Sequence, residues 1–186
     1  MHVLGAFAGR DVELKRRRIA VIHGEVLTEI VMTQDEFAEL VAPITNRIRD
    51  RALDKALEED LNRTFPADGA LFQSVFGACR AGVAAGWMCD REARGIRYGR
   101  VVKPGEATHG FSIDVVEMED IAGPNHRHPN GEIDMIMPLG ASAKFDGHGS
   151  GWLVYAPGSA HRPTVGEGKA LVLYLLPQGA IDFTRD

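Results

Sequence analysis

Three histidines and one glutamate stand at spacings that suit a metal site. His126 and His128 are two residues apart, so both side chains leave the same face of an extended backbone. Glu132 opens an apolar run shortly afterwards, and His161 follows Gly158 at a turn. Neutral imidazoles with one carboxylate suit a divalent transition metal such as Fe, Mn, Co, Ni or Zn. The sequence therefore predicts one metal site with four ligands: His126, His128, Glu132 and His161.

The same residues resemble the two motifs of the cupin superfamily. The first motif is matched by Gly123, His126, His128, Glu132 and Gly140, and the second by Gly151, Pro157, Gly158 and His161. Two departures are visible, because Gly123 sits closer to His126 than is usual and Pro157 directly precedes Gly158. The resemblance implies a cupin-type jelly-roll barrel around the four ligands. The alternative is that surface histidines fall at these intervals by chance, which would suit a lone His-x-His pair better.

The composition is typical of a globular chain, and 186 residues suffice for one domain or one domain with an extension. The net charge of -5, without a long basic run, argues against a nucleic-acid partner. No apolar stretch approaches the roughly 18 residues of a membrane span. Cys79 and Cys89 are the only cysteines, which favours a reducing cytoplasm as the location.

The chain before residue 90 is expected to form two segments. Residues 1–31 are predicted to be an upstream extension with little structure, and a short hairpin is the alternative. Residues 33–90 are predicted to be helical. They begin with a capping box, in which Thr33 is the N-cap and Glu36 the third helical residue.

Three helices are expected within the helical segment. Pro43 is expected to kink or divide the first of them. The second should end before Pro66, and the third should cover about residues 68–85. Their apolar faces suit a cap on a barrel or a dimer surface, so a homodimer is one prediction.

The remainder of the chain, residues 95–186, is predicted to be mostly β. Short apolar stretches alternate with turns rich in Gly and Pro, a pattern that suits a double-sheet jelly roll. The expected strands are residues 95–102, 111–118, 132–138, 143–145, 152–155 and 170–176. The predicted fold class is therefore mostly β: a cupin-type jelly-roll barrel preceded by an N-terminal helical segment.

A second carboxylate accompanies the predicted metal ligands. Asp134 lies two residues beyond Glu132, so it points to the same side of its strand, into the barrel. It is either a catalytic acid or base, or a partner that orients a histidine. The sequence leaves both roles open.

Arginines are dense between residues 91 and 100, and a guanidinium offers a planar fork for a carboxylate. If Ile96, Tyr98 and Arg100 share one face of a strand, Arg97 lies on the other. Arg97 is predicted to bind a substrate carboxylate, because Tyr98 and Gly99 beside it allow a ring to approach closely. The alternative for any single arginine is a solvated charged face.

Two stretches resemble the small bacterial 4-hydroxylaminobenzoate lyase family. They are GWMCDREARGIRYGR at residues 86–100 and PNHRHPNGE at residues 124–132, within a likeness that covers about residues 33–186. The resemblance implies a role in nitroaromatic degradation. The implied reaction converts 4-hydroxylaminobenzoate and water to 3,4-dihydroxybenzoate and ammonia, so the expected partner is a small aromatic carboxylate.

The candidate residues can be fitted to this implied lyase reaction. A metal would supply a Lewis acid, and Asp134 or Glu117 a proton donor. Arg97 and Tyr98 would bind the substrate, and Trp152 would stack on its ring. Two other classes stay open: a metal-dependent oxygenase acting on an aromatic or small organic acid, and a non-catalytic cupin that binds a small molecule.

Overall fold

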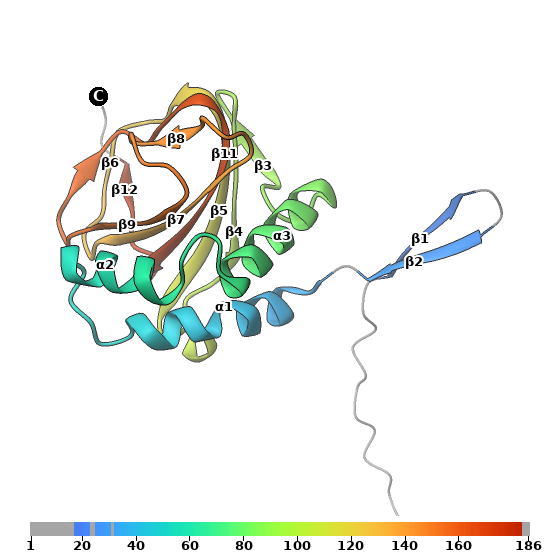
Figure 1. Cartoon of the computed structure of the whole chain (residues 1–186), viewed down its shortest axis with the longest axis horizontal. Helices are drawn as coiled ribbons and strands as arrows, with labels where there is room; N and C mark the ends of the chain where they lie inside the picture. Colours follow the sequence, from blue (N-terminus) through green and yellow to red (C-terminus); the bar gives the residue numbers. More distant parts are fainter. Residues whose placement is uncertain (1–16, 23–24, 31, 184–186) are drawn as a thin grey trace, which may run out of the picture.

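The computed structural model describes residues 17–22, 25–30 and 32–183. β1 (Arg17–Ile22) and β2 (Glu25–Ile30) pair antiparallel as a short hairpin, drawn apart from the barrel in Figure 1. This hairpin falls within the segment that was predicted to be an extension. The other residues of that segment lie outside the described part of the chain.

α1 (Gln34–Ile48) begins at the predicted capping box. The Thr33 hydroxyl accepts from the Glu36 amide at 3.2 Å, and the Glu36 carboxylate accepts from the Thr33 amide at 2.9 Å. Pro43 lies inside the helix, so of the two predicted outcomes, a kink or a division, the division does not occur. Glu39, four residues earlier, is exposed, so water can satisfy the carbonyl that Pro43 leaves without a donor.

Two more helices follow within the predicted ranges. α2 (Lys55–Thr64) begins at Asp54, whose carboxylate accepts from the Leu57 amide at 2.9 Å. α3 (Ala70–Ala84) ends just before Gly86, whose φ of 76° favours glycine. No helix in the described ranges is both long and apolar enough to cross a lipid bilayer.

The strands form a barrel from two antiparallel sheets. The larger, seven-stranded sheet has the order β3-β4-β5-β11-β7-β9, with β8 also paired to β11. Its strands are β3 (Arg91–Ala93), β4 (Ile96–Val102), β5 (Phe111–Ala122), β7 (Glu132–Pro138), β8 (Lys144–Phe145), β9 (Gly151–Tyr155) and β11 (Thr164–Pro177). The smaller sheet has the order β10-β6-β12, from β6 (His126–Arg127), β10 (Ala160–His161) and β12 (Asp182–Phe183). The only helical turn between these strands is η1 (Glu106–Thr108) within the described residues. The mostly β fold class is confirmed.

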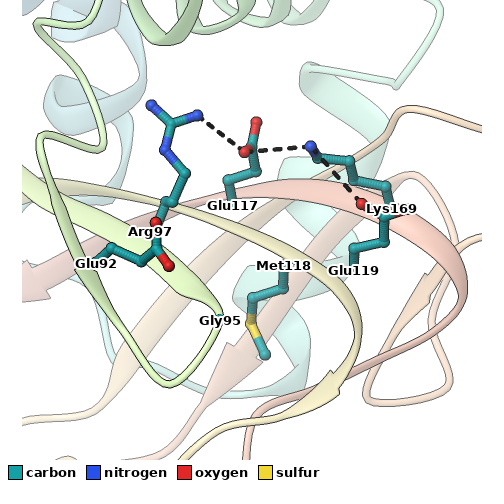
Figure 2. A pocket seen from close by; sticks show the side chains of 7 residues that line it. All are labelled: Glu92, Gly95, Arg97, Glu117, Met118, Glu119 and Lys169. Atoms are coloured by element: carbon teal, nitrogen blue, oxygen red, sulfur yellow. Dashed lines mark hydrogen bonds and ion pairs between the residues drawn. The ribbon is translucent and has the colours of Figure 1, made fainter.

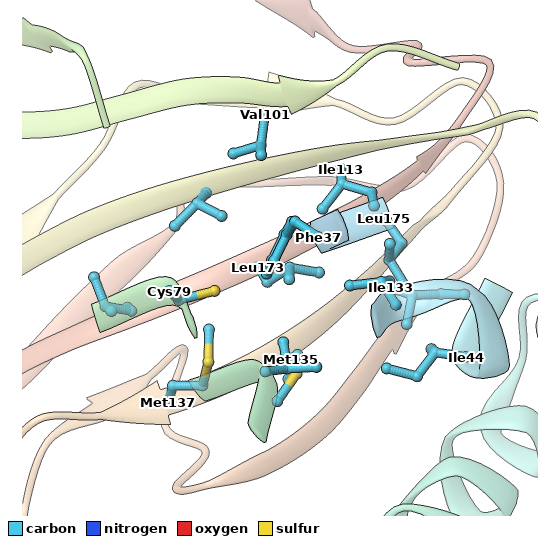
Figure 3. Packing of buried hydrophobic residues seen from close by; sticks show 14 of the residues in the cluster. Phe37, Ile44, Cys79, Val101, Ile113, Ile133, Met135, Met137, Leu173 and Leu175 are labelled. Carbon is cyan, nitrogen blue, oxygen red and sulfur yellow. The ribbon is translucent and has the colours of Figure 1, made fainter. Parts of the chain in front are cut away.

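The larger sheet separates two apolar cores. We call the face covered by the three helices the outer face and the opposite one the inner face (Figure 1). Outer-face side chains pack against the helices in Figure 3: Ile113, Ile133, Met135, Leu173 and Leu175 with Phe37, Ile44 and Cys79. Alternate residues form the inner core: Val116, Met118, Ile136, Val172 and Leu176. Strand alternation therefore decides whether a side chain meets the helices or the barrel interior.

α2 also covers the edge strand β9. The Asn62 side chain donates to the Trp152 carbonyl at 2.9 Å and accepts from the Trp152 amide at 3.0 Å. The Glu58 carboxylate accepts from the Val154 amide at 3.1 Å. These side chains take the place of a neighbouring strand, and they hold β9 and its Tyr155 beside the site described next.

Candidate metal centre

The four predicted ligands converge at one end of the barrel interior. His126 and His161 lie opposite each other in the smaller sheet, on β6 and β10. Glu132 begins β7 on the inner face of the larger sheet. His128 follows β6, where its amide donates to the Ser159 carbonyl at 2.9 Å. One ligand atom from each of the four side chains lies within 4.8 Å of all the others.

The three imidazoles point the same nitrogen at a common centre. The Nε2 of His161 is 3.1 Å from the Nε2 of His126 and 3.1 Å from the Nε2 of His128. The Nδ1 of His126 lies 3.1 Å from the Pro124 carbonyl, and the Nδ1 of His161 lies 2.6 Å from Asp146. Both of these partners can only accept, so each Nδ1 donates and each Nε2 is the nitrogen left to bind a metal.

The buried oxygens of the cluster indicate a cation. Glu132 is 0% exposed, and neither of its oxygens has a hydrogen-bond partner among the described residues. One oxygen lies 3.2 Å from His128 Nδ1 and the other 3.4 Å from His161 Nε2. A buried carboxylate without a donor is costly unless a cation compensates it. Three imidazole lone pairs and this carboxylate therefore fit a divalent transition metal.

The electrostatics of the cluster suit the same ion. Burial, reinforced by the neighbouring imidazoles, lowers the pKa of His126 to about 4 and of His128 to about 3. Both rings are thus neutral near pH 7, the form that binds metal. Burial alone would also lower the pKa of His161, but hydrogen bonds to Asp146 and Glu132 outweigh it and raise the pKa to about 9. These carboxylates favour positive charge at the point where a cation would bind.

Asp134 lies beside the cluster, on the inner face of β7, two residues after Glu132. Its side chain is 0% exposed, and neither oxygen accepts a hydrogen bond within the described ranges. Burial first, and the nearby Glu132 carboxylate second, raise the pKa of Asp134 well above its usual value. Its cross-strand partner on β11 is Tyr174, which is also buried. Asp134 therefore faces the barrel interior, as strand alternation predicted.

Arg97 and Glu117 lie on the outer face instead. They are opposite each other on β4 and β5, and Arg97 Nη1 donates to Glu117 Oε1 at 3.0 Å. Lys169 approaches the same oxygen at 3.2 Å (Figure 2). Both residues line a surface pocket together with α3 residues such as Phe76 and Arg80. The structure therefore keeps Arg97 and Glu117 out of the barrel interior, because odd-numbered β5 positions face the helices. The prediction had Arg97 bind the substrate carboxylate on the side of the pocket away from the metal, and Glu117 act as a proton donor.

Trp152 is likewise an outer-face residue. Its Nε1 donates to the Phe65 carbonyl at 2.8 Å, and its ring meets the edge of Phe72 with centroids 6.1 Å apart. It packs beneath α2 and α3, on the opposite face of the sheet from the metal ligands. From this position it cannot stack on a substrate at the metal centre, as was predicted. Tyr98, in contrast, takes an inner-face position opposite Val116 and is 37% exposed.

The sequence reasoning missed Asp146, which contacts the ligand His161. Its Oδ2 lies 2.6 Å from His161 Nδ1, although the two residues are 15 positions apart. Asp146 follows β8 with a φ of 47°, a conformation that Asp adopts in turns. An acidic residue directly before Gly147 was the available signal for a turn. Nothing in the local pattern showed that this turn returns to the metal centre.

The chain matches known proteins over most of its length. The family model described as PnbB, 4-hydroxylaminobenzoate lyase, matches residues 39–183, which include all four cluster residues. A 4-hydroxylaminobenzoate lyase of Nocardioides sp. (strain LMS-CY) is 32% identical over 160 residues, covering 81% of this chain and 95% of that protein. A protein of the same name from Pseudomonas putida is 30% identical over 167 residues, with coverage of 81% and 95%.

Among solved structures, an RmlC-like cupin protein from Ralstonia eutropha JMP134 is similar to part of the chain. It has 13% sequence identity and a TM-score of 0.38, and the likeness covers 50% of this chain and 62% of that one.

Proposed function

Because the chain belongs to the 4-hydroxylaminobenzoate lyase family, we propose that it converts 4-hydroxylaminobenzoate and water to 3,4-dihydroxybenzoate and ammonia. The observation that carries this proposal is the family match over residues 39–183, which spans the complete His and Glu cluster. The substrate class is that of the family, a small aromatic carboxylate.

The proposed reaction balances without an external oxidant. The N–O bond breaks and its oxygen leaves as water, which makes the ring electron-poor. Water then adds to the ring carbon next to the one that bears nitrogen. A further water replaces nitrogen on its own carbon, and ammonia leaves. One water is consumed overall. The nitrogen is reduced by two electrons and the ring carbon that exchanges hydrogen for hydroxyl is oxidised by two, while the carbon that exchanges nitrogen for oxygen keeps its oxidation state. The lyase therefore needs no dioxygen, unlike an oxygenase.

The metal ligands supply one part of this chemistry. A divalent ion of Fe, Mn, Co, Ni or Zn on His126, His128, Glu132 and His161 would act as a Lewis acid. The barrel walls around these residues exclude water, because His128 and Glu132 are both 0% exposed. A water-poor site strengthens every charge interaction with a bound substrate.

Asp134 is our candidate for proton transfer to the N-linked hydroxyl. Three features support this role: its position on the inner face two residues from Glu132, its complete burial, and the lack of a donor to its oxygens in the described residues. Loss of hydroxide from nitrogen requires a proton in the same step. Glu117 cannot share this role from the outer face, where Arg97 and Lys169 hold it.

We infer that Arg100, rather than Arg97, binds the substrate carboxylate. Arg100, Asp114, Tyr174 and Asp134 are successive cross-strand partners, so they form one row on the inner face. Three strand spacings of about 4.8 Å separate the ends of this row, roughly 14 Å between backbones. Because the Arg100 side chain is long, the distance from its guanidinium to Asp134 can be shorter than the distance between the backbones, and closer to the length of a benzoate.

The contacts of Arg100 suit such a role. Its Nε donates to Asp114 at 2.7 Å and one terminal nitrogen donates to the Gly179 carbonyl at 3.0 Å. These bonds fix the guanidinium, while the side chain stays 37% exposed. Tyr98, two residues earlier, shares the inner face and would contact the ring. Pre-positioned arginines bind carboxylates at a lower entropic cost.

The proposal is tested by turnover under exclusion of dioxygen. Purified protein loaded with each candidate metal is incubated with 4-hydroxylaminobenzoate, and 3,4-dihydroxybenzoate and ammonia are quantified. We expect equal amounts of both products with at least one metal. A requirement for dioxygen would indicate an oxygenase, and binding without turnover would indicate a non-catalytic cupin.

Two further properties stay predictions. The cytoplasmic location rests on Cys79 and Cys89, which are both free and buried thiols. The homodimer rests on the amphipathic helices alone, and size-exclusion chromatography with light scattering tests it.

A further inference from the structure

The Asp146 carboxylate joins three parts of the barrel. Its Oδ2 accepts from His161 Nδ1 at 2.6 Å and from the Tyr155 hydroxyl at 2.6 Å. Its Oδ1 accepts from the Thr164 amide at 2.7 Å. The three donors come from β10, β9 and β11, so one side chain connects a metal ligand to two strands of the larger sheet.

The backbone of Asp146 is anchored independently of its side chain. Its amide donates to the Thr164 carbonyl at 2.8 Å, so Asp146 and Thr164 bind each other in both directions. β8 directly before it pairs with β11 through Phe145 and Val165. The backbone bonds to β11 thus fix the position of the carboxylate, and Oδ2 in turn orients the His161 ring.

The consequence for His161 is a single ring orientation and a single tautomer. A proton on Nδ1 satisfies Asp146, which leaves Nε2 to bind metal, and Nε2 lies 3.1 Å from the Nε2 atoms of His126 and His128. The Tyr155 ring lies 4.3 Å from the His161 ring, between centroids, and limits its tilt. Without the carboxylate, His161 could rotate or take the tautomer that cannot bind metal through Nε2.

We propose that Asp146 is a positioning residue that sets the metal affinity of the centre by fixing the tautomer and orientation of His161. Tyr155 assists it as the second donor to the same oxygen. This inference rests on the metal centre of the proposed function, and it does not depend on the identity of the substrate. Partners of metal-bound histidines typically change metal affinity about 10- to 100-fold when they are replaced.

The test uses metal binding and ring tautomers, measured without substrate. Asp146→Asn keeps the shape of the side chain and removes its charge. We expect the Kd for Zn(II), from competition with a chelator, to rise about 10- to 100-fold. Tyr155→Phe should raise it much less, because it leaves the bond between Asp146 and His161 in place. The ring nitrogen shifts of His161, from NMR of the Zn(II)-loaded protein with nitrogen-15 histidine, should show a proton on Nδ1 and metal on Nε2 in the wild type, and a mixture of states in Asp146→Asn.

Asp120 offers a matched control. It is also an aspartate with positive φ, at 43°, and its Oδ1 also accepts a backbone amide, that of Gly168, at 2.8 Å. Asp120→Asn therefore makes the same chemical change at a position of β5 away from the ligands, and it should leave the Kd for Zn(II) unchanged. If Asp146→Asn fails to fold, the protonation of His161 Nδ1 in the Zn(II)-loaded wild type alone tests the role of Asp146.

The possible results separate this inference from the proposed function. Wild-type affinity in Asp146→Asn, or a His161 Nδ1 without a proton in the Zn(II)-loaded wild type, would overturn the role of Asp146. A weakened Kd with altered tautomers supports it even if the protein shows no lyase activity, and in that case only the proposed function fails. Absence of metal binding by the wild type would overturn both.

Discussion

Glu132 and Asp134 lie two residues apart on β7, and both carboxylates are fully buried on its inner face. The two side chains differ in what surrounds them. The Glu132 oxygens lie within 3.4 Å of two imidazole nitrogens, whereas Asp134 has Tyr174 opposite it on the next strand. These surroundings indicate two different roles, with Glu132 as a metal ligand and Asp134 as a residue that acts on the substrate.

The Asp134→Asn substitution tests that division. An amide cannot transfer the proton, so we expect kcat to fall about 10²- to 10⁴-fold while metal content stays near one ion per chain. Steady-state kinetics and elemental analysis on the same sample measure both quantities. Loss of metal in parallel with activity would assign Asp134 the orienting role, and an unchanged kcat would exclude it from catalysis.

The His128→Ala substitution tests the ligand set. His128 is 0% exposed and its Nε2 lies 3.1 Å from that of His161, so its loss should remove most of the bound metal. The fold should persist, because the backbone bonds of this loop to Ser159 and Gly158 do not involve the ring. His148→Ala, at an exposed turn residue, is the control and should retain full metal content. Equal metal content in both variants would rule out His128 as a ligand.

Strand alternation explains what could be predicted about the site. A period of two residues is local information, so it put Asp134 on the side of Glu132 and separated Arg97 from Arg100. It does not say which of the two faces lies inside the barrel. The answer depends on which face of β4 the helices cover, and that packing is a property of the tertiary fold. Arg97 was therefore assigned to the wrong face.

Asp146 shows the other limit of sequence reasoning. Its contact with His161 depends on the pairing of β8 with β11 and on the bonds between Asp146 and Thr164. β8 has only two residues, which is too short for a periodic pattern that could predict the strand or its pairing. The capping box at Thr33 was predictable for the opposite reason, because both partners lie within one helical turn.

The contact between α2 and β9 should contribute to stability. Asn62 satisfies both the amide and the carbonyl of Trp152, so Asn62→Ala leaves two backbone groups without partners. We expect the free energy of unfolding to fall by about 1–3 kcal/mol, measured by urea denaturation. Glu59→Ala, an exposed position on the same helix, should change it by less than about 0.5 kcal/mol. Equal effects of the two substitutions would contradict a specific role for Asn62.

Asp60 should make stability depend on pH in the acid range. Arg47 donates to both of its oxygens at 2.8 Å, and this bonding outweighs burial and lowers the pKa of Asp60 to about 2. The unfolded carboxylate titrates near pH 4. The stabilisation is therefore complete above about pH 4 and is lost as the pH falls through about 2. The Tm difference between wild type and Asp60→Asn should close over that window, and a constant difference would exclude this origin.

The two arginines on β4 provide the sharpest test of substrate recognition. Arg100 and Arg97 share one strand, but Arg100 lies on the inner face of the sheet with Asp114, and Arg97 on the outer face with Glu117. We expect Arg100→Ala to lower kcat/KM for 4-hydroxylaminobenzoate by about 1.5–3 kcal/mol, the contribution of a charge-assisted hydrogen bond. Arg97→Ala removes the same group from the outer face, so it should change kcat/KM little. With phenylhydroxylamine, which lacks the carboxylate, the Arg100→Ala effect should largely disappear. A larger loss in Arg97→Ala, or equal losses on both substrates, would show that the carboxylate binds elsewhere.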